Sequence, residues 1–87
     1  MILQELIDIE YKGWYVESAY DNIVTLRSDY TEDSLVEIYI KLENGNHVEV
    51  SFNSVNKSGI FFHASNLTPE EVSERTMEAA DNYFDYE

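Results

Sequence analysis

The feature that most constrains the fold is a pair of alternating runs within residues 35–53. Apolar and polar residues alternate over residues 35–42, and they do so again over residues 47–52. A period of two residues is typical of strands that bury one face and leave the other in water. Because the runs are separated by the short polar segment 43–46, the stretch predicts an antiparallel β-hairpin.

The loop length decides which side chains pair across this hairpin. A two-residue loop at Asn44 and Gly45 would place the apolar Ile40 opposite the carboxylate of Glu49. We therefore predict a three-residue loop over residues 43–45, with Gly45 at positive φ. The predicted apolar pairs are Ile40 with Val48, Ile38 with Val50, and Val36 with Phe52.

The start of the chain predicts a short helix over residues 2–11. Its apolar residues recur at helical spacing, namely Ile2, Leu3, Leu6 and Ile7. Lys12 and Gly13 are typical of a helix C-terminus, so we expect the helix to end there. A strand is the alternative for such a short apolar run.

The end of the chain carries a clear helix start. Thr68, Pro69 and Glu71 supply a capping hydroxyl, a proline at the first helical position and an acid at N3. We predict a helix over residues 69–84. The face that packs on the sheet is expected to contain Val72, Thr76, Ala79, Ala80 and Tyr83, flanked by Met77 and Phe84.

Two further segments complete the predicted sheet. Residues 14–20 and 23–30 indicate a second hairpin around Asp21 and Asn22, with Trp14, Val16, Ser18 and Tyr20 in one phase. Residues 60–63 form either a fifth strand at an edge or a strip buried under the last helix. The expected fold is a single α+β domain over residues 1–87. It has an antiparallel meander sheet of four or five strands, with the N- and C-terminal helices on one face.

The charge is far from balanced and excludes several classes of partner. Eighteen acids and five bases give a net charge of −13. Nucleic acid and anionic membranes would be repelled, so we expect neither as a direct partner and favour a basic protein surface. The chain has no cysteine, and we find neither a signal peptide nor a membrane span, so a cytoplasmic location is expected.

Catalytic and metal sites have weak support in the sequence. The two histidines, His47 and His63, lie far apart on predicted strands, and no spacing favours a catalytic triad. Three acids crowd one loop, namely Asp29, Glu32 and Asp33, but they lack the glycine and spacing of a calcium loop. We therefore expect no enzyme activity, no cofactor and no dedicated metal site.

The last predicted helix carries a row of acids along one side. The row contains Glu71, Glu74, Glu78, Asp81 and Asp85, at successive spacings of 3, 4, 3 and 4 residues. At a rise of 1.5 Å per residue, the row is about 21 Å long. The alternative is an ordinary solvated face of an acidic protein. The binding hypothesis assigns the row, together with Asp29, Glu32 and Asp33, to contact with a basic partner.

A short acidic chain with this outline resembles the small phage-encoded inhibitors, and is most similar to anti-CRISPR proteins that mimic DNA. The start of the chain carries the likeness, from Ile2 and Leu3 through Lys12 and Gly13 to Trp14. The resemblance implies a non-enzymatic inhibitor that occupies the nucleic-acid groove of a target protein. Two alternatives stay open: a structural or self-assembling protein that acts as a homodimer, and an immunity protein that neutralises a basic nuclease toxin. Monomer and homodimer are both compatible with the sequence.

Overall fold

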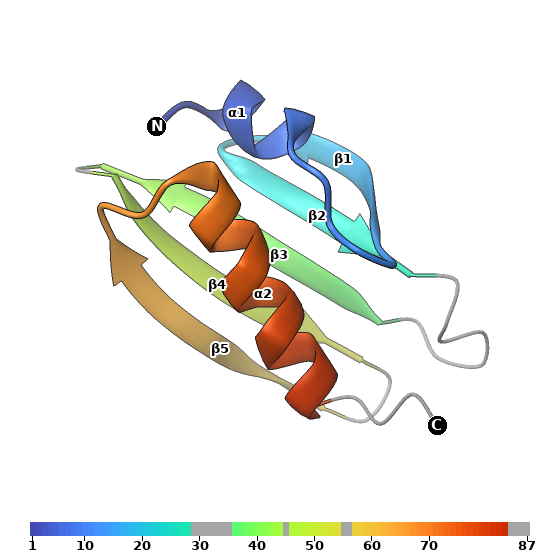
Figure 1. Ribbon diagram of the computed structural model, residues 1–87. Coiled ribbons are helices and arrows are strands. Elements are labelled where there is room, and N and C mark those ends of the chain that lie inside the picture. Colours follow the sequence, from blue (N-terminus) through green and yellow to red (C-terminus); the bar gives the residue numbers. More distant parts are fainter. Residues whose placement is uncertain (29–35, 45, 55–56, 84–87) are drawn as a thin grey trace.

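Five antiparallel strands form one sheet in the order β1-β2-β3-β4-β5, and the two helices cover one of its faces (Figure 1). The computed structural model describes residues 1–28, 36–44, 46–54 and 57–83. The predicted α+β meander is therefore confirmed, with five strands. The elements are α1 (Leu3–Asp8), β1 (Tyr15–Tyr20), β2 (Ile23–Arg27), β3 (Glu37–Glu43), β4 (His47–Asn53), β5 (Ser58–Ser65) and α2 (Pro69–Tyr83).

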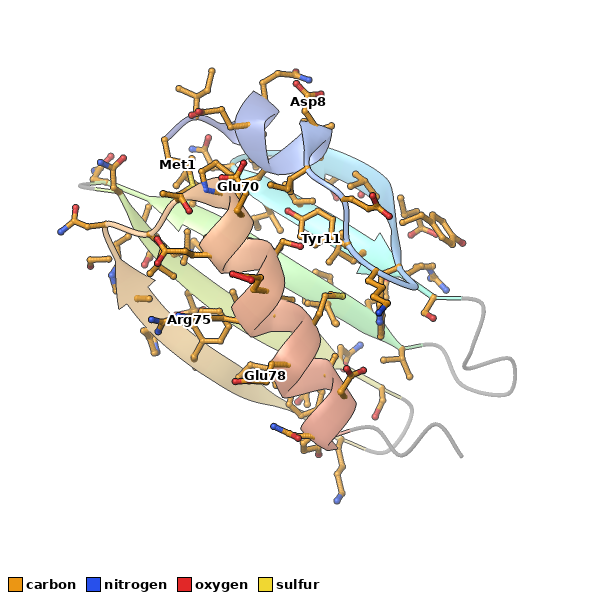
Figure 2. All side chains as sticks on the ribbon, viewed as in Figure 1. Met1, Asp8, Tyr11, Glu70, Arg75 and Glu78 are labelled. Carbon is orange, nitrogen blue, oxygen red and sulfur yellow. The ribbon has the colours of Figure 1, made fainter. Side chains whose placement is uncertain are left out.

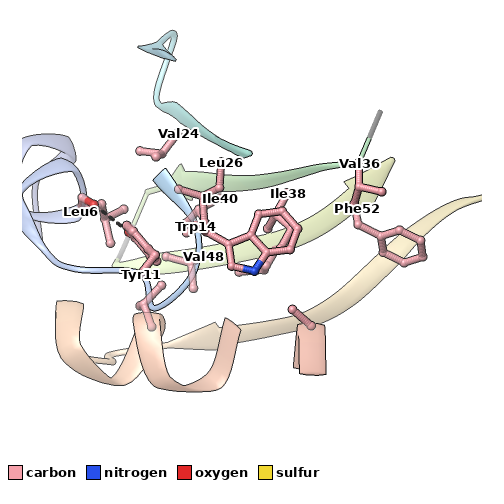
Figure 3. Close-up of a cluster of buried hydrophobic side chains, with 13 residues drawn as sticks. Leu6, Tyr11, Trp14, Val24, Leu26, Val36, Ile38, Ile40, Val48 and Phe52 are labelled. Carbon is pink, nitrogen blue, oxygen red and sulfur yellow. Dashed lines mark hydrogen bonds between the residues drawn. The ribbon is translucent and has the colours of Figure 1, made fainter. Parts of the chain in front are cut away.

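The core lies between the helices and the covered face of the sheet (Figure 3). Alternate residues of the central strands supply most of it, because successive side chains of a strand point to opposite faces. Leu6 and Tyr11 contribute from α1 and the segment after it, and Val72 and Ala80 contribute from α2. The buried sheet residues are Val24, Leu26, Val36, Ile38, Ile40, Val48, Val50 and Phe52.

The central hairpin has the predicted faces in a different register. Ile40 pairs with Val50, and Ile38 pairs with Phe52, so the predicted pairs were wrong by two residues. The observed register extends the strands, because Glu43 now pairs with His47 and the loop becomes residues 44–46. A shift of two residues leaves every side chain on its original face. Asn46 takes the left-handed conformation at φ 57°, whereas Gly45 lies outside the described residues.

The first hairpin turns where the sequence predicted. Asp21 and Asn22 both have positive φ, at 52° and 62°, which is the backbone of a type I′ hairpin turn. The predicted phase of β1 was wrong beyond Val16, because a bulge between Val16 and Ser18 shifts the pairing. Tyr20, predicted to share a phase with Trp14 and Val16, is consequently 69% exposed. Ala19 packs against the core in its place.

The N-terminal helix is shorter than predicted. α1 ends at Asp8, and the next residue, Ile9, is already extended with ψ 154°. The chain then makes a separate turn in which the Trp14 N–H donates to the Tyr11 carbonyl at 2.8 Å. Gly13 has φ 83° in this turn. Its left-handed backbone thus serves a β-turn and not the helix C-terminus that the sequence suggested.

The fifth strand resolves the ambiguity over residues 60–63. β5 is an edge strand, paired with β4 alone among the described strands. A bulge at Phe61 interrupts the pairing between Ile60 and Phe62. Phe61 stacks on Phe52 with ring centroids 4.8 Å apart. The edge-strand alternative is therefore the one that the structure adopts.

The C-terminal helix begins with the predicted capping box. The Glu71 N–H donates to Thr68 Oγ1 at 3.2 Å, and the Thr68 N–H donates to Glu71 Oε1 at 2.9 Å. The predicted packing face is largely correct, since Val72, Thr76 and Ala80 are buried. The last residue of the predicted helix, Phe84, lies outside the described residues.

Replacing Thr68 with alanine should lower the free energy of unfolding by about 1 kcal/mol. The substitution removes the hydroxyl that accepts the Glu71 N–H and disrupts the reciprocal cap. Urea unfolding followed by circular dichroism measures the change. Thr68→Ser retains the hydroxyl and should stay close to wild type. Equal losses in both variants would show that the hydroxyl does not stabilise the helix.

Candidate partner-binding surface

The acid row predicted on the last helix lies in solvent along α2. Glu71, Glu74, Glu78 and Asp81 are all exposed, and Asp85 lies outside the described residues. The four described acids extend over about 15 Å of helix. Glu71 also accepts the capping hydrogen bond from Thr68. The other three point away from the buried side of the helix, which contains Val72, Thr76 and Ala80.

The structure adds acids from α1 and from the segment after it to this row. Ser73 Oγ of α2 donates to the Glu10 carbonyl at 2.6 Å, which ties the segment after α1 to the middle of α2. Between them lies an open groove of about 740 Å³, lined by Glu10, Lys12, Ser73, Glu74, Met77, Glu78, Asp81 and Asn82. A smaller hollow of about 260 Å³ joins Glu5 and Asp8 to Glu70. Figure 2 shows Asp8, Glu70 and Glu78 on the helix-bearing side.

We call the exposed acids of this side the acidic face. It consists of Glu5, Asp8, Glu10, Glu70, Glu71, Glu74, Glu78 and Asp81. The α2 row was predicted from Glu71 onward, and Glu70 directly precedes it. Glu5, Asp8 and Glu10 were missed because they come from a segment some sixty residues away in sequence. The one usable signal was the prediction that both helices cover the same side of the sheet.

The carboxylates of the acidic face differ from the others in their pairing. Within the described residues, none of the eight lies at ion-pair distance from a basic side chain. Two do accept local hydrogen bonds besides Glu71: Glu5 from the Ile2 N–H at 2.8 Å, and Asp8 from Gln4 Nε2 at 2.9 Å. The face also holds two bases, Lys12 and Arg75. Its negative charge is thus mostly uncompensated.

On the opposite side of the sheet, which we call the open face, the acids on strands lie beside basic or histidine side chains. Arg27 Nε lies 2.6 Å from Glu17 and its Nη2 lies 3.3 Å from Glu37. The hydrogen bond from Arg27 to Glu17 raises the pKa of the guanidinium. Tyr39 donates to Glu37 at 2.8 Å, and burial, followed by this hydrogen bond, raises the pKa of the Tyr39 phenol.

The far end of the open face holds both histidines. His47 Nε2 lies 3.6 Å from Glu43, and His63 Nδ1 lies 3.9 Å from Glu49. Their rings are 5.7 Å apart, and His47 Nδ1 shares a 2.7 Å hydrogen bond with Ser65. In the described part of the chain, no three His, Asp or Glu side chains gather so as to hold a metal ion. The predicted loop acids, Asp29, Glu32 and Asp33, lie outside the described residues.

Comparisons with known proteins do not assign this surface. No family model matches the chain, and neither a curated protein nor a solved structure matches it. Across the described residues, no helix is long and apolar enough to cross a membrane. The distribution of charge over the two sides of the sheet is therefore the main indication of function.

Proposed function

We propose that this protein is a non-enzymatic inhibitor that binds a basic, nucleic-acid-binding surface of a target protein through its acidic face. The observation that carries the proposal is the contrast in pairing between the two sides. The four acids of the open face that lie on strands, Glu17, Glu37, Glu43 and Glu49, each have a basic or histidine neighbour. The eight acids of the acidic face have none among the described residues.

Unpaired carboxylates on one helix cost stability that a structural role does not require. Two carboxylates about 6 Å apart in water repel each other by about 0.7 kcal/mol before screening by salt. Lysines interspersed on α2 would remove this repulsion and add favourable pairs. A basic partner relieves the same repulsion on binding, which supports a binding role for the row.

The dimensions of the row agree with a substitute for phosphates. Neighbouring acids along α2 are separated by about 5–6 Å of helix axis. The described row of about 15 Å covers roughly four base-pair steps of 3.4 Å each. Glu10 widens the charged strip beyond a single line, since it lines the groove beside Glu74 and Glu78. A groove that binds nucleic acid through its phosphates would therefore accept this face in place of its substrate.

The test compares two variants with the same change in net charge. One double variant is Glu74→Gln with Glu78→Gln, and the other is Ser18→Lys with Tyr20→Lys. Each raises the net charge from −13 by two. The first pair changes the acidic face, and the second changes β1 on the open face. Long-range steering falls equally in both, so a difference reports local contact. We expect the glutamine variant to lose at least about tenfold in partner affinity, and the lysine variant to lose far less.

The assay is capture of proteins from host lysate on the immobilised chain, followed by elution with double-stranded DNA. We expect DNA to release the captured partner, because both ligands occupy one groove, and we expect affinity to fall steeply as salt rises. Retention of the same partner by the glutamine variant, or a partner that DNA does not displace, would contradict the proposal. Capture of a secreted nuclease toxin would instead identify an immunity protein.

A further inference from the structure

One long segment of the chain contains no acidic residue. Residues 50–69 contain no aspartate or glutamate, although acids make up 18 of the 87 residues. The next longest acid-free segment, residues 22–28, has seven residues. The free segment includes the whole of β5 and carries one base, Lys57. One edge strand of the sheet thus carries no carboxylate, in a chain with a net charge of −13.

This edge also lacks the usual protection of an edge strand. β5 is eight residues long, and it contains no lysine, proline or carboxylate. Natural edge strands are commonly short or charged, because an open row of backbone donors and acceptors recruits further strands. Ile60 is 55% exposed, and His63 is exposed as well. The bulge at Phe61 protects the first half only, since pairing with β4 is regular from Phe62 to Ser65.

The other edge strand, β1, differs in its charge and in the position of its bulge. β1 carries Glu17, and its bulge lies in the middle of the strand between Val16 and Ser18. No strand in the described part of the chain pairs with the outer edge of either β1 or β5. Of the two edges, β5 is therefore the one on which a strand can add over a regular, uncharged segment.

We propose that a second copy of this chain pairs with β5, antiparallel and edge to edge, to form a dimer with a continuous sheet. A copy fits this edge because its own β5 supplies an extended strand without a carboxylate, and so approaches without the repulsion between the acids of two −13 chains. Antiparallel pairing of a strand with itself is symmetric about a two-fold axis, so one contact satisfies both chains. The inference is independent of the function proposed above.

The geometry of this pairing determines what the dimer presents. A two-fold axis between antiparallel edge strands is perpendicular to the sheet, so both α2 helices lie on the same face. Arg75 lies on the β5 side of α2 (Figure 2), which places a base and not the acid row beside the junction. The two acidic faces consequently point in one direction, and the dimer offers them as one surface.

The dependence on salt concentration distinguishes dimerisation from binding to a basic partner. Like charges on the two copies oppose dimerisation, and salt screens them, with a Debye length of about 8 Å at physiological ionic strength. Dimerisation should therefore strengthen as salt rises, whereas binding to a basic groove should weaken. The failure of one interaction would leave the salt dependence of the other unchanged.

Sedimentation velocity of the purified chain tests the proposal with three single variants. His63→Lys places a lysine opposite Glu49 within the sheet, but puts a positive charge on the regular half of β5 in each copy, at the proposed junction. Ile60→Lys adds the same charge to the first half of β5. Tyr20→Lys is the control, because Tyr20 is exposed on β1 and the change in charge is identical.

At about 100 μM protein we expect wild type and Tyr20→Lys to sediment at about twice the 10.2 kDa monomer mass. His63→Lys should have a dissociation constant at least about tenfold weaker, and Ile60→Lys, on the bulged half of β5, should weaken the dimer less. Thermal unfolding of each variant checks that the fold is retained. A monomeric wild type at that concentration and high salt would overturn the proposal. A dimer that Tyr20→Lys disrupts, or that both β5 variants retain, would overturn it equally.

Discussion

Replacing Ile38 with alanine should lower the free energy of unfolding by about 2–5 kcal/mol. Ile38 is 0% exposed and lies at the centre of the sheet, between Leu26 of β2 and Phe52 of β4. The substitution leaves a cavity that neighbours held in two flanking strands cannot fill. A domain of this size has about 5–15 kcal/mol in total, so the variant should be partly unfolded at 37 °C. Urea denaturation measures the loss.

Ile23→Ala is the matched control for this change. Ile23 belongs to β2, pairs with Lys41 on the open face, and is only partly buried. The same deletion there removes less buried area, so we expect a loss below about 1 kcal/mol. Comparable losses at the two positions would mean that the open face is as well packed in solution as the covered face, contrary to the single core described here.

Raising the pH above about 10 should destabilise the fold through Tyr11. The side chain is 3% exposed, and its hydroxyl donates to the Leu6 carbonyl at 2.6 Å. Burial raises the pKa of Tyr11 well above its ordinary value. The folded chain therefore keeps a proton that the unfolded chain releases near pH 10. Stability from this group is complete below that pH. It falls by about 1.4 kcal/mol per pH unit above it, until the folded pKa is reached.

Tyr11→Phe separates this effect from general alkaline damage. The variant should lose about 1 kcal/mol at pH 7, because the Leu6 carbonyl loses its donor. It should also show a shallower decline in unfolding free energy between about pH 10 and 12, since the titrating group is gone. Tyr20→Phe serves as the control at a tyrosine that is 69% exposed. A wild-type slope retained in Tyr11→Phe would exclude Tyr11 as the cause.

Local signals in the sequence predicted local structure well. The capping box at Thr68 and the turn at Asp21 and Asn22 depend on residues within three positions of one another, and both are confirmed. The faces of the central hairpin were also correct, because the alternation defines them in any register that differs by two residues. The register itself was wrong. Glu43 pairs with His47, and Asn46, directly before β4, takes the left-handed conformation, which asparagine tolerates better than most residues.

The features that the sequence did not reveal depend on contacts between distant segments. Nothing near Glu17 indicates the β1 bulge, which places that residue beside Arg27 of the next strand. The acidic face illustrates the same limit. The α2 row follows from helical spacing, but Glu10 joins it through a hydrogen bond between its carbonyl and Ser73. Helical spacing predicts which charges share one side of a helix, whereas packing on the sheet determines which segments lie side by side.

The strand order has a consequence for how the chain folds. Each strand pairs with its neighbour in sequence, so the sheet can be built by successive hairpin closures without a long crossover. Closing short loops costs little chain entropy, and topologies rich in such pairings fold faster than sheets with distant partners. α2 follows the five strands in sequence, so the part of the apolar face that it covers stays exposed until this fifteen-residue helix docks.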